Sequence, residues 1–268
     1  MTVSEGALFE PAGDRFVATG LSRGPWDPGA CHGGPVSALL TRAVERLELD
    51  GDAWQLARLT VELTRPVPVG KPLTLTTAVE RPGRKVSLVA AALADGDTEV
   101  ARVRALRIRR AELQLPVDSD LAVDVTMPPW DGIEPEVPTW AIGDDLAFHS
   151  NANEHRFVES RWDVPGPVAV WIRLNVPLIA GEEPSGVQRA MAAADFGNGI
   201  SGSLAHEDWV FINPDLTVHL VRPPEGEWIG MRTASRYSPT GAGLAESELF
   251  DVAGRLGRSC QSLFVDRR

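Results

Sequence analysis

The residues with the clearest chemical potential lie in the second half of the chain, where Asp195 and Gln261 are set in apolar surroundings. When the two halves are aligned on a shared segment, Asp195 falls on Ala38 and Gln261 on Ala105. A carboxylate can take a proton from an attacking water, and an amide can hold the water or the carboxylate in place. Polar side chains that only one half possesses are candidates for function, because the shared fold does not require them.

The shared segment is an internal repeat. Residues 59–66, LTVELTRP, and residues 216–223, LTVHLVRP, are identical at six of eight positions. A long repeat indicates that one structural unit is used twice, and two units of roughly 110 residues are of common domain size. We place these units at 1–112 and 156–268. Between them, residues 113–155 form a linker rich in proline and acidic residues.

Composition narrows the class of protein. The net charge of −11 argues against nucleic-acid binding, which needs clustered cations. Two cysteines, Cys31 and Cys260, are too few for a disulfide framework, and no secretion signal is evident, so we expect a cytoplasmic protein. No apolar run approaches the roughly 18 residues of a membrane span. The histidines and cysteines lack metal-ligand spacing, and we expect no cofactor.

In the first unit, apolar residues at helical spacing predict a helix over 33–47 that begins at Gly33-Gly34-Pro35. Four segments rich in Val, Thr and Leu follow it and are separated by Gly and Pro turn signals. They predict strands of an antiparallel meander at 56–65, 72–80, 86–94 and 99–109.

The second unit shows the same order of elements. We predict a strand over 168–176, a helix over 187–196 that Gly197 and Gly199 terminate, and a repeated meander from Trp209 onward. Each unit is then a helix, with one strand before it, wrapped by a curved antiparallel sheet. This is an α+β architecture, the hot-dog arrangement, and two copies make a double hot dog. The fused pair covers sheet edges that are otherwise exposed. The sequence leaves open whether the chain also assembles into a homodimer or a larger homo-oligomer.

The linker contains apolar residues that we expect to pack over the protein surface. These residues are Leu121, Val123, Val125, Met127, Trp130 and Trp140.

This layout resembles the acyl-CoA thioesterase II family of double hot dogs. The residues that carry the resemblance are His32-Gly33-Gly34, Asp195, the run Asn213-Pro214-Asp215-Leu216-Thr217, and Gln261. The resemblance implies hydrolysis of an acyl-CoA to a free acid and CoA.

The resemblance also implies a set of catalytic residues. The family uses an Asp on the second unit's helix, a Thr, Ser or Asn at the start of the next strand, and a Gln on the last strand. Asp195 and Gln261 match the first and the third. Asn213 and Thr217 both compete for the middle position. Thr217 has a counterpart, Thr60, in the first unit, so Asn213 is the better catalytic candidate and Thr217 the more structural one.

Thioester hydrolysis needs few catalytic groups, because a thiolate is a good leaving group and requires no strong general acid. It requires a positioned water, a base such as Asp195, and donors for the developing oxyanion. Backbone N–H groups at the start of the first helix can supply those donors. Gly33 and Gly34 would let the backbone approach the substrate closely, and Gly197 would leave room beside Asp195.

Each assignment has a plainer alternative. Asp195 can simply bond local backbone, Gln261 can face solvent, and Asn213 before Pro214 is a common turn start. Gly33-Gly34 can serve helix packing alone. We interpret three histidines as packing or surface residues: His32, His206 and His219.

Two other functions compete with the thioesterase. Asp27 and His32 stand five residues apart, as in hot-dog enoyl-CoA hydratases, although the Asn-Pro usually found between them is missing. A non-catalytic acyl-CoA-binding protein is the second alternative. The chain's only basic cluster could bind a CoA phosphate, but a charged strand edge is the commoner meaning of such a cluster. It consists of Arg102, Arg104, Arg107, Arg109 and Arg110.

Overall fold

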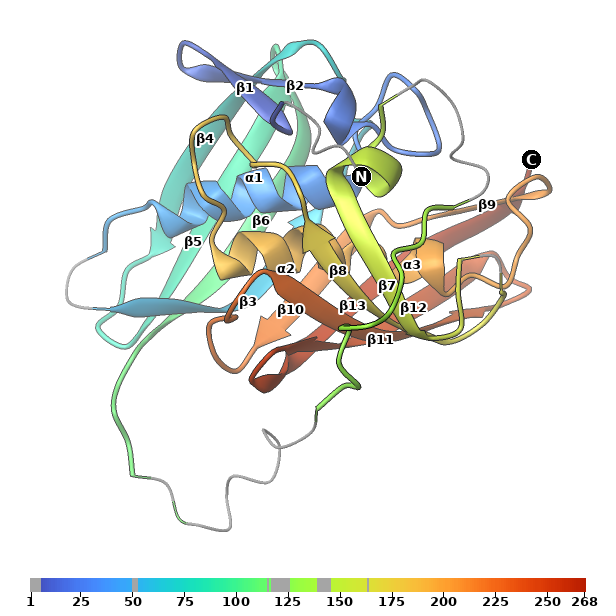
Figure 1. Cartoon of the computed structure of the whole chain (residues 1–268). Coiled ribbons are helices and arrows are strands. Elements are labelled where there is room, and N and C mark those ends of the chain that lie inside the picture. Colours follow the sequence, from blue (N-terminus) through green and yellow to red (C-terminus); the bar gives the residue numbers. More distant parts are fainter. Residues whose placement is uncertain (1–5, 50–52, 115, 117–125, 139–145, 163) are drawn as a thin grey trace.

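Two helices at the centre of the molecule lie side by side (Figure 1). The computed structural model describes residues 6–49, 53–114, 116, 126–138, 146–162 and 164–268. The central helices are α1 (Gly33–Glu45) and α2 (Gly186–Ala194), and a short α3 (Gly197–Ile200) follows α2. His32 caps the start of α1, where its side chain accepts the Gly34 N–H, and the Ser185 hydroxyl caps the start of α2. These caps satisfy backbone N–H groups that a helix leaves without partners.

The strands of the described residues form one 13-stranded sheet in which all pairs of named strands are antiparallel. In the first half the strands are β1 (Phe9–Ala12), β2 (Arg15–Ala18), β3 (Trp54–Glu62), β4 (Pro72–Arg81), β5 (Val86–Asp95) and β6 (Thr98–Arg109). In the second half they are β7 (Asn153–Glu159), β8 (Val168–Leu174), β9 (Trp209–Ile212), β10 (Asp215–Leu220), β11 (Trp228–Tyr237), β12 (Ala242–Asp251) and β13 (Gly254–Arg267).

The two halves of the sheet meet at β3 and β10. The strand order is β1-β2-β4-β5-β6-β3-β10-β13-β12-β11-β8-β7, with β9 also paired to β13. In the central pair Thr60 lies opposite Thr217, the equivalent positions of the repeated segment. The predicted strands are therefore present, but the prediction of a four-strand meander was wrong for β3. That strand pairs with β6 and β10 instead of β4. One of its edges continues the sheet of the first half, and the other forms the junction between the halves.

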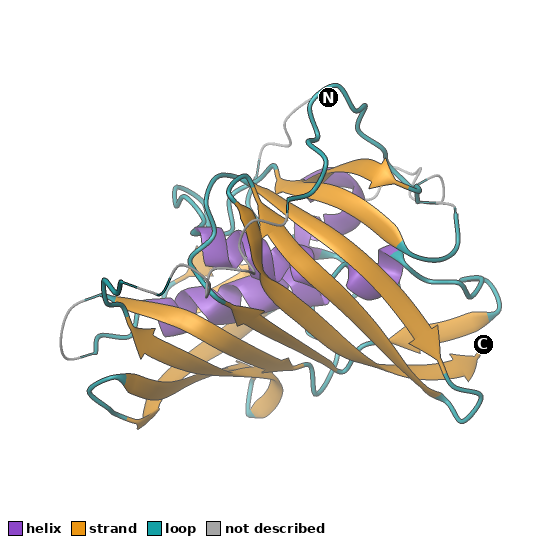
Figure 2. Ribbon diagram, turned by 90° about the horizontal axis from the view of Figure 1, so that it is seen from below, coloured by secondary structure: helices purple, strands orange, loops and turns teal. Residues whose placement is uncertain are grey.

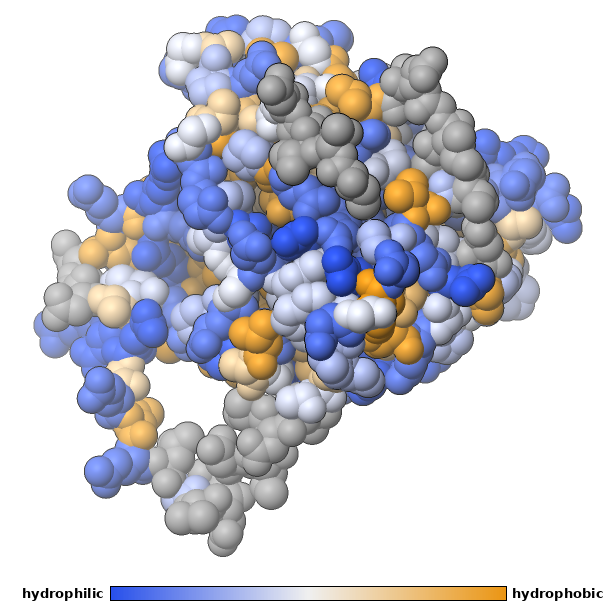
Figure 3. All heavy atoms as spheres, in the orientation of Figure 1, coloured by the Kyte–Doolittle hydropathy of each residue, from blue (hydrophilic) through white to orange (hydrophobic). Residues whose placement is uncertain are grey.

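The concave side of the sheet holds the helices and the core (Figure 2). α1 packs against β3, β4, β5 and β6, and α2 packs against β8, β10, β11 and β12. The apolar stripe of α1 that the sequence predicted, which includes Leu39, Leu40 and Val44, is completely buried. The outer surface in the view of Figure 3 is mainly hydrophilic, with apolar residues in small groups. The layers thus follow the apolar patterning of the helices.

The part of the linker around Met127 and Trp130 packs on the sheet, as expected, whereas Leu113 at its start is exposed. Met127 is buried, and the Trp130 ring lies against Trp171 and Trp228, with centroids 4.8 and 5.3 Å away. The other four apolar residues named above fall outside the described residues. Regular structure begins at Phe148, in a π-helical turn that ends at Ala152, so it starts inside the range that we assigned to the linker.

Two local expectations differ from the structure. Among the described residues, two strands precede each main helix where one was expected. Gly197 and Gly199 do not terminate α2, because Asp195 already caps it and both glycines lie in α3. No helix of the described residues is long and apolar enough to cross a membrane.

The close approach of the two helices depends on Gly34. A Cβ atom there would lie 2.6 Å from the Ala192 carbonyl oxygen and 2.8 Å from Cε1 of Phe148. We therefore predict that Gly34→Ala lowers the free energy of unfolding by about 1–3 kcal/mol through overpacking. Gly199→Ala is the matched control, because a Cβ there meets nothing within 4 Å, and it should leave stability unchanged or raise it slightly. Guanidinium unfolding of the two variants measures both effects, and equal stabilities would contradict the packing role.

Candidate active site

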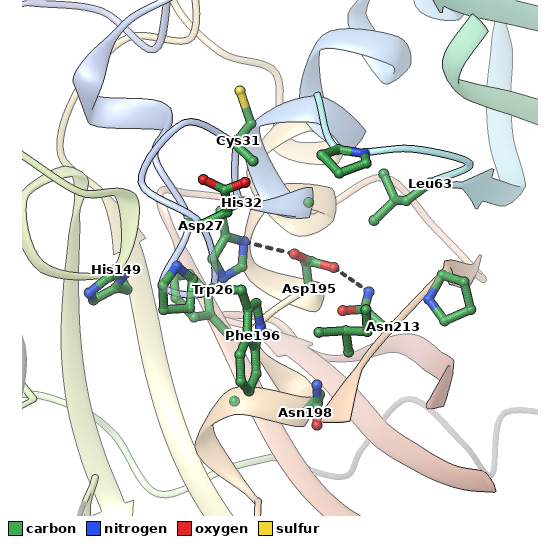
Figure 4. Close-up of a pocket in the computed structure, with 18 of the residues that line it drawn as sticks. Trp26, Asp27, Cys31, His32, Leu63, His149, Asp195, Phe196, Asn198 and Asn213 are labelled. Carbon is green, nitrogen blue, oxygen red and sulfur yellow. Dashed lines mark hydrogen bonds and ion pairs between the residues drawn. The ribbon is translucent and has the colours of Figure 1, made fainter. Parts of the chain in front are cut away.

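Asp195 lies where the C-terminal end of α2 meets the N-terminal end of α1 (Figure 4). It is the C-cap of α2, and only 4% of the residue is exposed. A buried ionised carboxylate is costly unless hydrogen bonds replace its water shell. The residues around Asp195 supply those bonds.

Two amides donate to Asp195. Asn213, in the turn between β9 and β10, donates from Nδ2 to Oδ1 of Asp195 over 2.8 Å. Gln261, buried on β13, donates from Nε2 to the Asp195 carbonyl oxygen (3.1 Å) and to Oδ1 (3.2 Å), while its Oε1 accepts the Asn198 N–H. Asn213 also donates to the Asp215 carbonyl oxygen, so it forms the turn and holds the carboxylate at once. Three of the four predicted catalytic residues therefore meet.

The fourth, Thr217, does not join them. Its hydroxyl lies 3.4 Å from the Thr60 hydroxyl across the central strand pair, and it is not among the described residues that line the cavity beside Asp195. This placement agrees with the inference that a residue present in both halves is structural.

His32 is the residue that sequence reasoning missed. Its Nδ1 lies 2.7 Å from Oδ2 of Asp195 and also 3.1 Å from the Gly34 N–H. Nδ1 has one in-plane position for hydrogen, so it either donates to the carboxylate or accepts from Gly34. We had interpreted His32 as a packing or surface residue. Its place directly before Gly33-Gly34, at a predicted helix start, was the signal that could have identified it.

The three predicted substrate-binding glycines have different surroundings. A Cβ atom on Gly33 would lie 2.7 and 2.8 Å from the Asp195 carboxylate oxygens, so only glycine fits between α1 and this carboxylate. Gly33 lines the cavity, whereas Gly34 and Gly197 are not among its described lining residues. A Cβ on Gly197 would lie 2.9 Å from Oε1 of Gln261. Gly197 therefore leaves room for Gln261, which in turn holds Asp195.

A cavity of about 340 Å³ opens beside Asp195. His149, Phe196 and Asn198 line it from buried positions, and Trp162 is half-buried. Half-buried and exposed residues from the loops after α3, β3 and β9 and from the loop before α1 form its mouth. Asp27 lies at this mouth and its Oδ1 accepts the Gly29 N–H (2.8 Å), whereas His32 faces Asp195. Asp27 and His32, the pair of the hydratase alternative, therefore contact different partners.

Several titratable groups near the cavity are held neutral. Desolvation raises the pKa of the Cys31 thiol to about 12, which disfavours the thiolate that a nucleophile needs. Desolvation, with a smaller contribution from neighbouring histidines, lowers the pKa of His149 to about 4 and that of His155 to about 3. Among the described residues, no group of three His, Cys, Asp or Glu side chains could hold a metal ion.

Comparisons with known proteins identify the family. Residues 122–265 match the acyl-CoA thioesterase C-terminal domain, and residues 22–108 match the acyl-CoA thioesterase N-terminal domain. The first match alone spans more than half of the chain. The protein belongs to the acyl-CoA thioesterase family and is a thioester hydrolase, as the resemblance implied. A comparison with curated proteins finds no match.

Solved structures confirm the hot-dog fold. A protein classed as a thioesterase II from Thermobifida fusca is 19% identical, with a TM-score of 0.71 over 96% of this chain and 94% of the other. A hot-dog protein of unknown function from Alicyclobacillus acidocaldarius is 15% identical, with a TM-score of 0.71 over 96% and 95% of the chains. An acyl-CoA thioesterase II from Mycobacterium marinum is 14% identical, with a TM-score of 0.66 over 97% and 96%.

The buried neutral histidines predict a loss of stability in acid. Their folded pKa values, about 4 for His149 and about 3 for His155, lie below the ordinary 6.5. The unfolded chain therefore binds more protons below pH 6.5, and the free energy of unfolding should fall as the pH drops from there toward 4. At about pH 5 the loss should be on the order of 2 kcal/mol for each histidine.

Guanidinium unfolding at about pH 7.5 and about pH 5 measures this loss. His155→Phe keeps a ring against Trp162 and Phe196. It should reduce the fall in the free energy of unfolding between the two pH values by about half. His219→Gln, a change at an exposed histidine, is the control and should retain the full fall. An unchanged fall in His155→Phe would contradict the prediction.

Proposed function

We propose that the protein hydrolyses an acyl-CoA with Asp195 as the general base. The observation that carries this proposal is the Asp195 carboxylate, which borders the cavity and contacts His32 (2.7 Å) and Asn213 (2.8 Å). A water at this carboxylate can lose a proton to it while attacking the thioester carbonyl carbon. The C–S bond of the resulting tetrahedral intermediate then breaks and releases the CoA thiolate.

The groups around Asp195 act as positioning residues. An amide is no base near neutrality, so Asn213 and Gln261 contribute by holding Oδ1 in a fixed direction. His32, when protonated at Nδ1, donates to Oδ2 and holds the second oxygen. Each carboxylate oxygen has two lone pairs, so a water can still bind beside these donors.

The start of α1 is the proposed oxyanion site. The first N–H groups of a helix lack acceptors within the helix, and Gly33 is the first residue of α1 and lines the cavity. Its backbone N–H can stabilise negative charge on the carbonyl oxygen during attack. The base and the oxyanion donor then come from different halves of the chain.

We also propose that the two halves are duplicated hot-dog units, at 1–112 and 156–268, and that only one of them retains a site. At the equivalent place in the other half, the Glu45 carboxylate accepts from Ser185 (2.8 Å) and Gln188 (2.6 Å) at the start of α2. A Cβ on Gly186, the first residue of α2, would lie 2.5 Å from the Pro224 carbonyl oxygen. A second cavity of about 310 Å³ borders this junction. The positions that correspond to Asp195 and Gln261 are alanines in this half, and we therefore propose one active site per chain.

Replacement of the base tests the mechanism. Asp195→Asn should lower kcat by roughly 100- to 10,000-fold, the contribution of a general base, with the fold intact by circular dichroism. Release of free thiol from a panel of acyl-CoAs measures the loss. The same panel should include crotonyl-CoA with a test for hydration of its double bond. An active, normally folded Asp195→Asn variant would contradict the role of Asp195, and hydration without thiol release would favour the hydratase.

A double-mutant cycle tests whether the positioning residues act through Asp195. Gln261→Ala and Asn213→Ala should each lower kcat strongly in the native background and add little in an Asp195→Asn background, because groups that act as a unit give non-additive losses. Thr217→Ala is the structural control. It should change the free energy of unfolding and leave kcat nearly unchanged. Additive losses at Gln261 and Asp195, or coupling of Thr217 to Asp195, would falsify this arrangement.

A further inference from the structure

Among the described residues, one side chain that lines the mouth of the cavity carries a fixed positive charge. A second guanidinium, that of Arg268, lies outside the lining, 5.7 Å from the ring of Trp26. Arg65, in the loop after β3, is the only lysine or arginine among the described residues that line the cavity, and it is exposed. No described carboxylate forms an ion pair with it. The exposed carboxylate at the mouth, Asp27, bonds the Gly29 N–H through Oδ1 instead. A guanidinium group at the entrance is therefore available to a ligand.

The equivalent arginine in the other half is used differently. Arg222 occupies the place of Arg65 in the repeated segment, and it binds the buried Asp251 through two bonds of 2.6 Å. Asp251 is the last residue of β12, and the corresponding last residue of β5 is Asp95. Asp95 pairs with Lys71 at 3.7 Å, not with Arg65. The fold can thus hold this arginine internally, yet one half leaves it at the cavity mouth.

From this contrast we infer that Arg65 binds the phosphate groups of the CoA carrier, an inference that rests on the proposed function. When the thioester lies at Asp195, the strongly hydrated phosphates must stay outside the cavity. Guanidinium binds phosphate through two parallel hydrogen bonds. The net charge of −11 repels an anionic ligand at long range, so recognition of CoA needs a local cation at the entrance.

The arginine cluster that the sequence singled out is less suited to this task. Arg102 pairs with Glu62 and Arg104 with Glu80. Arg107 donates to the Leu47 carbonyl oxygen over 2.7 Å, at the C-terminal end of α1. None of the five arginines of this cluster is among the described residues that line the cavity.

Hydrolysis of one acyl group on three carriers tests the inference. The carriers are CoA, dephospho-CoA and pantetheine, the last of which lacks all the phosphates. Arg65→Ala should raise KM for the acyl-CoA roughly tenfold, the value of one charged hydrogen bond, with kcat nearly unchanged. KM for the acyl-pantetheine should not change, and Arg65→Lys should recover part of the loss. Dephospho-CoA shows whether the 3′-phosphate or the diphosphate is bound.

Arg84→Ala is the matched control. Arg84 is an exposed arginine in the turn between β4 and β5, so its loss changes the net charge equally but lies away from the cavity lining. Rising salt should raise KM of the native protein for the acyl-CoA and affect Arg65→Ala much less, because salt screens exposed charges. Equal KM changes for the CoA and pantetheine thioesters, or an Arg84→Ala effect as large as that of Arg65→Ala, would overturn the inference.

Calorimetric binding of CoA separates this inference from the proposed function. Native protein should bind one CoA per chain, and Arg65→Ala should bind it roughly tenfold more weakly. CoA binding that depends on Arg65, without any thioester hydrolysis, would refute the proposed function and support the role of Arg65 in phosphate binding. Hydrolysis that depends on Asp195, with no effect of Arg65 on CoA, would refute the inference alone.

Discussion

The antiparallel packing of α1 against α2 is the constraint on which the site depends. Gly34 lets the helices approach closely at Ala192, and this contact brings the C-terminal end of each helix to the N-terminal end of the other. A helix start presents unpaired N–H groups and partial positive charge. The carboxylates of Asp195 and Glu45 lie at these two starts. Helix packing alone therefore defines two places where a carboxylate is favoured beside backbone donors.

The two helix junctions differ in their side chains although their geometry is similar. At one, Gly33 and Asp195 border a cavity, and the carboxylate is held by side chains that leave it beside open space. At the other, which also borders a cavity, of about 310 Å³, Glu45 is bound by Ser185 and Gln188, and the Pro224 backbone packs against the helix start. The difference lies in a few side chains and one loop, while the strand pairing at the centre of the sheet matches equivalent positions. One fold thus holds a carboxylate at a helix start in two ways, with different side-chain partners.

The cost of burying Asp195 connects the site to the whole sheet. Its oxygen atoms receive donors from β13 and from the turn before β10, and one of them lies 2.7 Å from His32 at the start of α1. These elements come from both halves of the chain, so the carboxylate has its full set of partners only when the sheet is joined at β3 and β10. The same close packing that positions the site also holds His149 and His155 neutral.

By itself the sequence determined the helices and most strands, because apolar periodicity and turn residues are local signals. The family was indicated separately, by a resemblance that a few residues carry. The sequence also indicated Asp195, Gln261 and Asn213 as candidates, through the resemblance and the differences between the halves. Only the tertiary structure decided that β3 joins β10, that His32 contacts Asp195, and that Thr217 lies apart. Such contacts join residues distant in the chain, and their partners depend on strand order and helix packing, which local patterns do not specify. A histidine that precedes two glycines can have several roles, and the role of His32 depends on the residues that the fold places beside it.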